Sequence, residues 1–262
     1  MRFAQVDVFS EVPYRGNPVA VLLDADHLDD HRMLEIARWT NLSETTFVVA
    51  PEHPDADYRV RIFTPFGELP FAGHPTLGTA HAWLEHGGVA RRSSIVQECA
   101  VGLITVRTDH RLAFRAPPTL RTGSLESEVL AQVEAVIDAE IIDHQWVDNG
   151  PGWAAVQLAD AAAVRAVTPD FRELGDIKLG LVGLHPEGSE CALEVRALFN
   201  GIEDPVTGSL NASLAQWFYR TGKIDHDYLA SQGTGRVSVS RDEQDEVWVG
   251  GATVTCFSGT AR

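Results

Sequence analysis

Apolar and polar positions along the first part of the chain follow the periods of strands and helices in turn. Residues 58–63, YRVRIF, place apolar side chains at every second position, which predicts a strand with one buried face. Residues 30–40 and 75–86 place them three and four positions apart, which predicts two helices. Further apolar runs predict strands at 2–9, 18–23, 45–50, 103–108 and 111–116. The apolar face expected for the helix at 30–40 consists of Met33, Leu34, Ile36, Ala37 and Trp39.

The second part of the chain repeats this alternation. The polar, proline-containing stretch RAPPTLRTG at 115–123 is the best candidate for a linker between the two parts. We therefore expect two domains, 1–116 and 117–262, with the last strands able to pack back on the first domain. The elements expected after the linker are helices at 125–139 and 205–220 and strands at 146–158 (broken by a turn), 179–184, 192–199, 236–240 and 247–257.

One short motif occurs twice, as HPTLGT at 74–79 and as DPVTGS at 204–209, 130 positions apart. Proline favours the first position of a helix, so each copy predicts a helix start with His74 or Asp204 at the cap. The repetition indicates an internal duplication that produced two similar domains. If the two helix starts face each other across a cleft, their free N–H groups suit an anion such as a carboxylate.

Neither cap residue is sufficient evidence of a catalytic function when it is considered alone. Aspartate is a preferred helix cap, so Asp204 fits a structural role as well as a catalytic one. Histidine is a poor cap, and His74 is either satisfied by local hydrogen bonds or placed for chemistry. Gly78 and Gly208 in the two motifs allow a close approach of the backbone.

A third candidate, Glu44, lies where the helix at 30–40 gives way to a strand. A glutamate at such a junction is often solvated. Leu42 and Phe47 flank it, however, and a carboxylate held against apolar surface has its pKa raised, which suits an acid/base catalyst.

Composition narrows the classes of partner. Asp and Glu outnumber Lys and Arg by 37 to 21 among 262 residues, a net charge of −16, which disfavours nucleic acid and anionic membranes. No apolar run approaches the roughly 20 residues of a membrane span, and acidic Asp7 and Glu11 disfavour a secretory signal. The three cysteines are far apart, which favours a reducing, cytoplasmic location and buried thiols.

Five blocks together resemble the phenazine-biosynthesis isomerase family (PhzF-like), which shares its fold with diaminopimelate epimerase. They occur in order and span nearly the whole chain. The blocks are VDVFSEVPYRGNPVAVLL (6–23), NLSETTFV (41–48), FTPFGELPFAGHPTLGTA (63–80), DNGPGW (148–153) and EDPVTGSLNASLAQW (203–217).

The resemblance implies an α+β fold of two pseudo-symmetric domains, each with a mixed, barrel-like sheet around a central helix. It also implies a cytoplasmic, homodimeric biosynthetic isomerase without metal or organic cofactor. Such an enzyme moves a proton between carbons of a small carboxylate such as dihydro-3-hydroxyanthranilate, in the interdomain cleft. The resemblance places acid/base catalysis on Glu44 with support from His74 and Asp204, and substrate binding on Gly73, Gly208, Ser209 and Asn17, the last without an assigned role.

Three other functions are less consistent with the sequence. The epimerase branch uses a cysteine near each central helix start, and neither start here contains one. A metal-dependent hydrolase could use His74, His81, Glu44 and Asp204, but their spacing matches no known metal motif. A non-catalytic protein that binds a small carboxylate would keep the cleft but would not need Glu44 beside it.

The first prediction is that activity requires neither a metal ion nor a thiol. Incubation with EDTA, or alkylation of the thiols under native conditions, should leave the isomerase rate unchanged. Loss of activity in EDTA with recovery on addition of zinc would support the hydrolase instead.

Overall fold

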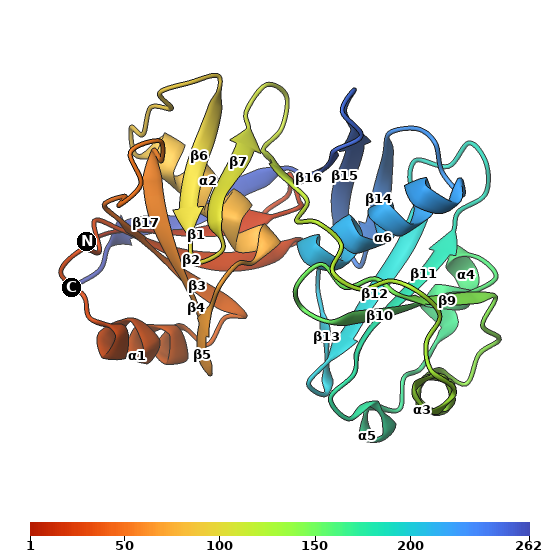
Figure 1. The fold of residues 1–262 in the computed structure, drawn as a ribbon. Helices are drawn as coiled ribbons and strands as arrows, with labels where there is room; N and C mark the ends of the chain where they lie inside the picture. Colours follow the sequence, from red (N-terminus) through yellow and green to blue (C-terminus); the bar gives the residue numbers. More distant parts are fainter. The chain divides into compact units, whose positions relative to one another are not determined.

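The computed structural model describes all residues 1–262, and the chain forms two compact units (Figure 1). Unit 1 contains Met1–Arg115 and Gly250–Arg262, and unit 2 contains Ala116–Val249. The division begins at the proline-rich stretch 115–123, but residues 250–262 lie in unit 1 rather than with the second half. Their strand, β17 (Thr253–Thr260), pairs antiparallel with β1 (Arg2–Val8), which accounts for this placement.

Unit 1 is a mixed sheet with one central and one outer helix. Its strands pair in the order β17-β1-β2-β3-β4-β6-β7-β8, and β5 forms a hairpin on β4. The β2–β3 and β4–β6 pairs are parallel and the others are antiparallel. The remaining elements are β2 (Asn17–Leu23), α1 (Asp30–Thr40), β3 (Glu44–Val49), β4 (Tyr58–Thr64), β5 (Gly67–Leu69), α2 (Gly73–Glu85), β6 (Ser94–Cys99), β7 (Gly102–Arg107) and β8 (Ala113–Arg115).

Unit 2 repeats the same pairing scheme. Its strands run β9-β10-β11-β12-β14-β15 with β13 as a hairpin on β12. The parallel pairs are β10–β11 and β12–β14, which correspond to β2–β3 and β4–β6 in unit 1. The α+β fold of two similar units, each with a mixed sheet and a central helix, is therefore confirmed. The elements are α3 (Ser127–Ile137), β9 (Asp143–Trp146), β10 (Trp153–Gln157), α4 (Ala161–Ala166), α5 (Phe171–Leu174), β11 (Lys178–Leu184), β12 (Leu193–Phe199), β13 (Ile202–Asp204), α6 (Gly208–Thr221), β14 (Tyr228–Gln232), β15 (Gly235–Arg241) and β16 (Val247–Gly250).

The structural repeat has a different offset from the sequence motif. β4 and β12, β5 and β13, and α2 and α6 begin 135 positions apart, whereas the two motif copies are 130 apart. The counterpart of His74 is therefore Ser209, and the counterpart of Asp204 is Leu69. The prediction that the motif copies occupy matched positions is wrong. The stretch of chain between β5 and its motif copy is five residues longer than the stretch between β13 and its motif copy.

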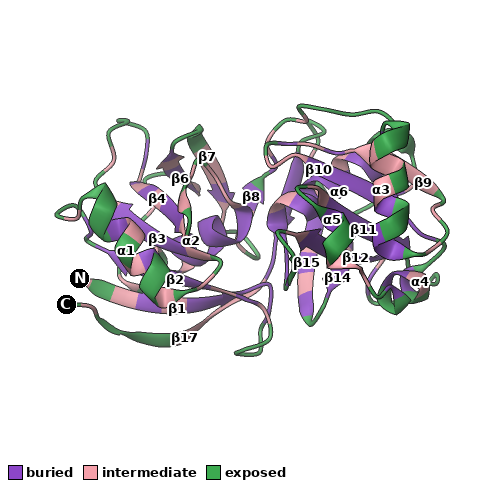
Figure 2. Cartoon of the chain, turned by 90° about the horizontal axis from the view of Figure 1, so that it is seen from below, coloured by how far each residue is buried: buried purple, intermediate pink, exposed green.

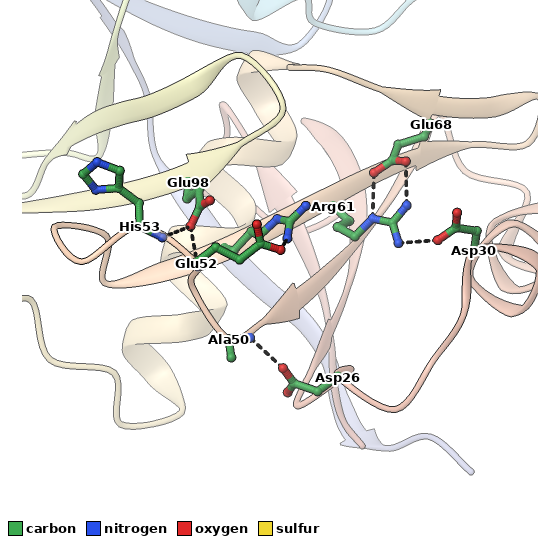
Figure 3. Close-up of polar contacts among 9 residues, drawn as sticks. Asp26, Asp30, Ala50, Glu52, His53, Arg61, Glu68 and Glu98 are labelled. Carbon is green, nitrogen blue, oxygen red and sulfur yellow. Dashed lines mark hydrogen bonds and ion pairs between the residues drawn. The ribbon is translucent and has the colours of Figure 1, made fainter.

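The same ion pair in both units supports this offset. Arg61 on β4 donates two hydrogen bonds to Glu68 on β5, at 2.8 and 2.6 Å, and a third to Asp30 at the start of α1 (Figure 3). Arg196 and Glu203 make the equivalent two-fold contact, at 2.8 and 2.7 Å. Each arginine therefore fixes the short hairpin that precedes a central helix.

Both predicted helix starts need correction. The cap of α2 is Ala72, so Pro75 is the third helical residue, where its missing N–H is still not needed by the helix. The cap of α6 is Thr207 rather than Asp204. Asp204 pairs with Ala197 in the β12–β13 hairpin, and the proline after it also favours an extended conformation, so the helix begins later.

The central helices pack closely on their sheets. In α2 the side chains from His74 to Ala80 are all buried, and Gly78 lies against β2, where a Cβ atom would come within 2.3 Å of Val19. In unit 2 the glycine is on the strand: a Cβ atom on Gly180 would come within 2.5 Å of Leu210 on α6. Glycine on one side of each contact therefore sets the depth of the helix.

The outer helix α1 covers the opposite face of the first sheet, and its solvent side is exposed (Figure 2). It buries Met33 and Ala37, with Leu34 and Ile36 partly buried. The prediction that Trp39 joins this face is wrong, since Trp39 is 86% exposed. It follows Ala37 by two positions, or about 200° around the helix axis, and so points to the other side.

The second prediction concerns the contact at Gly78. Gly78→Ala should lower the free energy of unfolding by about 1–3 kcal/mol, the usual cost of overpacking, in urea denaturation. Val19→Ala should make room for the new methyl group, so the double variant should lose less than the sum of the single losses. Gly259→Ala, with no atom within 4 Å of its Cβ position, is the control. Equal losses at positions 78 and 259 would contradict the packing argument.

Candidate active site

The structure brings Glu44 and His74 together in unit 1, although they are 30 positions apart in the sequence. Glu44 is the first residue of β3, and His74 is the second residue of α2. Glu44 Oε2 lies 3.4 Å from His74 Nε2, and the two side chains are only 15% and 7% exposed. The hydroxyl of Thr79 donates to that of Thr46 one turn further along α2, which shows that this face of β3 meets the helix.

The protonation state of His74 follows from its surroundings. Burial lowers the pKa of His74 to about 3, although a hydrogen bond to the Pro18 carbonyl opposes the shift, so the ring is neutral near pH 7. Because Nε2 makes no hydrogen bond, Nδ1 donates to Pro18. The Nε2 lone pair therefore faces Glu44 and can accept a hydrogen bond only when the Glu44 carboxyl carries a proton. Because the ring is neutral, the contact is not an ion pair.

Asn17 and Gly73 lie beside this pair. Asn17 is fully buried at the start of β2, next to the Pro18 carbonyl that holds His74. Gly73 is the first residue of α2 and is also buried. Asn17, Glu44, Gly73 and His74, four of the seven predicted site residues, thus form one group, called here the unit 1 site.

The other three predicted residues, Asp204, Gly208 and Ser209, belong to unit 2. Asp204 is 7% exposed, and one of its carboxylate oxygens, Oδ2, accepts a hydrogen bond from the hydroxyl of Thr207. Ser209 Oγ accepts from Trp153 Nε1 at 3.1 Å, and the Ser209 carbonyl accepts from Asn149 Nδ2 at 3.2 Å. Asp204, Thr207, Gly208 and Ser209 are called here the unit 2 site.

Sequence reasoning missed several contributors. Asn149 and Trp153 lie in the DNGPGW block, so a signal for them existed, but nothing in the local sequence of Thr207 or Gln232 indicated a contact with Asp204. Lys178 had no signal either. It begins β11 as Glu44 begins β3, and the register of each strand with β4 or β12 makes the two residues equivalent.

At the position equivalent to Glu44, unit 2 has a basic residue, Lys178. Gly180 faces Leu210 of α6, and Lys178, two residues earlier on β11, lies on the same face of the strand. The side chain of Thr207, the cap residue of α6, makes no capping hydrogen bond to the N–H groups of the first helical turn. By its register, Lys178 occupies the position in unit 2 that Glu44 occupies beside α2, and a cation together with helix N–H groups suits a carboxylate.

The remaining candidates have other partners. His81 contacts the hydroxyls of Thr253 and Thr255 on β17, at 2.9 and 3.1 Å, and so ties α2 to the C-terminal strand. Burial raises the pKa of the Cys99 and Cys191 thiols. Cys256, expected to be buried, is partly exposed; it is the residue left unpaired by the register shift between β17 and β1. None of the helices has both the length and the apolar character needed to cross a membrane.

Comparison with known proteins identifies the family. The sequence model described as "Phenazine biosynthesis-like protein" matches residues 6–259. The chain is 35% identical to "Antisense-enhancing sequence 1" of Schizosaccharomyces pombe (98% of this chain, 97% of that protein) and 32% identical to "Trans-2,3-dihydro-3-hydroxyanthranilate isomerase" of Pseudomonas fluorescens (97% of each). The crystal structure of a PhzF-family protein from Enterococcus faecalis superposes with a TM-score of 0.85 at 26% identity and covers each chain completely.

The chain therefore belongs to the phenazine biosynthesis-like (PhzF) family. It is an enzyme of the isomerase class, as the family resemblance predicted.

The third prediction uses the lowered pKa of His74. In the unfolded chain the ring protonates near pH 6.5, whereas in the folded protein it stays neutral down to about pH 3. The stability that depends on the neutral ring is therefore complete above pH 6.5 and is lost as the pH falls toward 3, at up to about 1.4 kcal/mol per pH unit. In urea denaturation at several pH values, His74→Gln should show a correspondingly shallower loss.

The exposed His110→Gln is the matched control and should keep the wild-type slope. If His74→Gln also keeps that slope, the buried neutral ring is not the source of the pH dependence.

Proposed function

We propose that this isomerase moves a proton between carbon atoms of a small substrate with a carboxylate, without an organic cofactor or metal. Glu44 is the acid/base group, and dihydro-3-hydroxyanthranilate is the model for the substrate. The contact between Glu44 and the neutral ring of His74 carries this proposal, since it accommodates the carboxyl in its protonated form. The proposal includes action in the cytoplasm as a homodimer.

The chemistry needs one group that both takes and returns a proton. The Glu44 carboxylate removes a proton from one carbon, and the electron pair of the broken C–H bond moves into the conjugated system of the substrate. The Glu44 acid then returns the proton to a different carbon, so no net oxidation or reduction occurs. While the proton is on Glu44, the His74 Nε2 lone pair accepts a hydrogen bond from it and stabilises the intermediate stage.

Residues of both units take part in the proposed reaction. The ammonium of Lys178 and the first N–H groups of α6, at Gly208 and Ser209, suit the substrate carboxylate. Asp204 accepts hydrogen bonds and so suits an amine or hydroxyl of the substrate. Asn17 and Gly73 line the substrate position next to His74, with Asn17 held beside the Pro18 carbonyl.

The fourth prediction tests the acid/base group. Glu44→Gln keeps the size of the side chain but cannot exchange the proton, so kcat should fall at least about a hundredfold with trans-2,3-dihydro-3-hydroxyanthranilate as substrate. In heavy water, the wild-type product should carry deuterium at a carbon position. The exposed Glu35→Gln on α1 is the control and should keep the wild-type rate.

Two results would contradict the proposed function. A Glu44→Gln variant with near wild-type turnover would remove the acid/base role from this residue. A wild-type protein that binds small carboxylates without turnover and without deuterium uptake would be a binding protein instead.

A further inference from the structure

Gln232, which belongs to neither predicted motif, has every hydrogen-bonding group of its side chain engaged next to Asp204. It is the last residue of β14 and is 1% exposed. Its amide nitrogen donates to the Asp204 carbonyl at 3.1 Å and to Thr207 Oγ1 at 3.0 Å. Its amide oxygen accepts from the Thr207 N–H and from Asn211 Nδ2, both at 3.0 Å.

These contacts determine which way the amide points. The Thr207 N–H is only a donor and the Asp204 carbonyl is only an acceptor, so the oxygen of Gln232 must face the first and the nitrogen the second. Asn211 adds a consistent constraint, because its Nδ2 also donates to the Thr207 carbonyl at 2.9 Å. The reversed amide would oppose like groups at these contacts.

The amide orientation in turn determines the direction of the Thr207 hydroxyl. Thr207 Oγ1 accepts a hydrogen bond from Gln232, and a hydroxyl has only one proton to donate. That proton goes to Asp204 Oδ2. A chain of directed hydrogen bonds therefore runs from Gln232 through Thr207 to the Asp204 carboxylate, within side chains that are at most 7% exposed.

We propose that Gln232 is a positioning residue for the isomerase reaction, acting through the Thr207 hydroxyl to hold the Asp204 carboxylate in place as a hydrogen-bond acceptor. This inference rests on the proposed function and deepens it, because it gives Asp204 a fixed orientation toward the substrate. The alternative is that Gln232 only stabilises the turn between β13 and α6. The amide nitrogen serves both roles, since it also donates to the Asp204 carbonyl, but only the positioning role requires the Thr207 hydroxyl, so variants of Thr207 separate the two.

Gln232→Glu and two variants of Thr207 together separate them. Its carboxylate still accepts from the Thr207 N–H and from Asn211, which preserves that side of the turn. The second oxygen replaces the donor nitrogen, so the bond to the Asp204 carbonyl is lost and the Thr207 proton turns toward residue 232 and away from Asp204. Thr207→Val removes the hydroxyl altogether, and Thr207→Ser keeps it.

In steady-state kinetics with trans-2,3-dihydro-3-hydroxyanthranilate, Gln232→Glu and Thr207→Val should lower kcat about tenfold to a hundredfold, as expected for a lost hydrogen bond to a charged group. Thr207→Ser should restore most of the rate. In an Asp204→Asn background, Gln232→Glu should cost less than about twofold, since the two residues act together. Gln244→Glu, on the exposed surface of unit 2, controls for the added charge and should have no effect.

A second measurement does not depend on the substrate. In NMR spectra of the wild-type protein, the Thr207 hydroxyl proton should exchange slowly with water and show contacts to Asp204. In Gln232→Glu, this proton should exchange fast and lose its contacts to Asp204. In Thr207→Ser, the serine hydroxyl proton should still exchange slowly and show contacts to Asp204. If the wild-type protein turns over no substrate, the proposed function fails while this result still decides the role of Gln232.

The positioning role is overturned if the Thr207 proton still points to Asp204 in Gln232→Glu. It is also overturned if the rate losses of Gln232→Glu and Asp204→Asn multiply independently, or if Gln232→Glu lowers only the melting temperature.

Discussion

The depth at which each central helix packs against its sheet is the constraint on which the rest of the structure depends. In unit 1, Gly78 allows α2 to approach Val19 of β2 without the clash that any side chain would cause. This approach brings the first turn of α2 under the ends of β2 and β3, where the Pro18 carbonyl and Glu44 meet His74. A helix one methyl group further out would give His74 neither its buried, neutral ring nor its carboxyl partner.

The two units use one framework for different chemistry. At matched positions, unit 1 has Glu44 and His74 where unit 2 has Lys178 and Ser209, and unit 2 has Asp204 where unit 1 has Leu69. The arginine–glutamate pair that fixes each hairpin is the same in both. The framework is thus repeated, whereas the side chains that would meet a substrate differ in charge and in hydrogen-bonding capacity.

The spacing of apolar residues, together with turn-forming residues, was sufficient to predict the long helices and strands. The helix at 30–40 has the predicted bounds, and most long strands differ by one or two residues. The short or more polar strands β5, β6, β13 and β14 were missed, because three to six residues carry little periodic signal. Glu44 and His74 were predicted from motifs, and the structure brings them together. Lys178 and Gln232 were not, because their importance arises from strand register and from hydrogen bonds between distant positions.

The C-terminal strand of unit 1 has a consequence for how the chain is made. β17 pairs along the whole of β1, and Met1 and Ala261 exchange backbone hydrogen bonds. Unit 1 is therefore assembled from both ends of the chain, whereas unit 2 is continuous. During synthesis, all of unit 2 is translated before the last strand of unit 1. Until β17 emerges from the ribosome, unit 1 lacks one of its strands and β1 has an open edge.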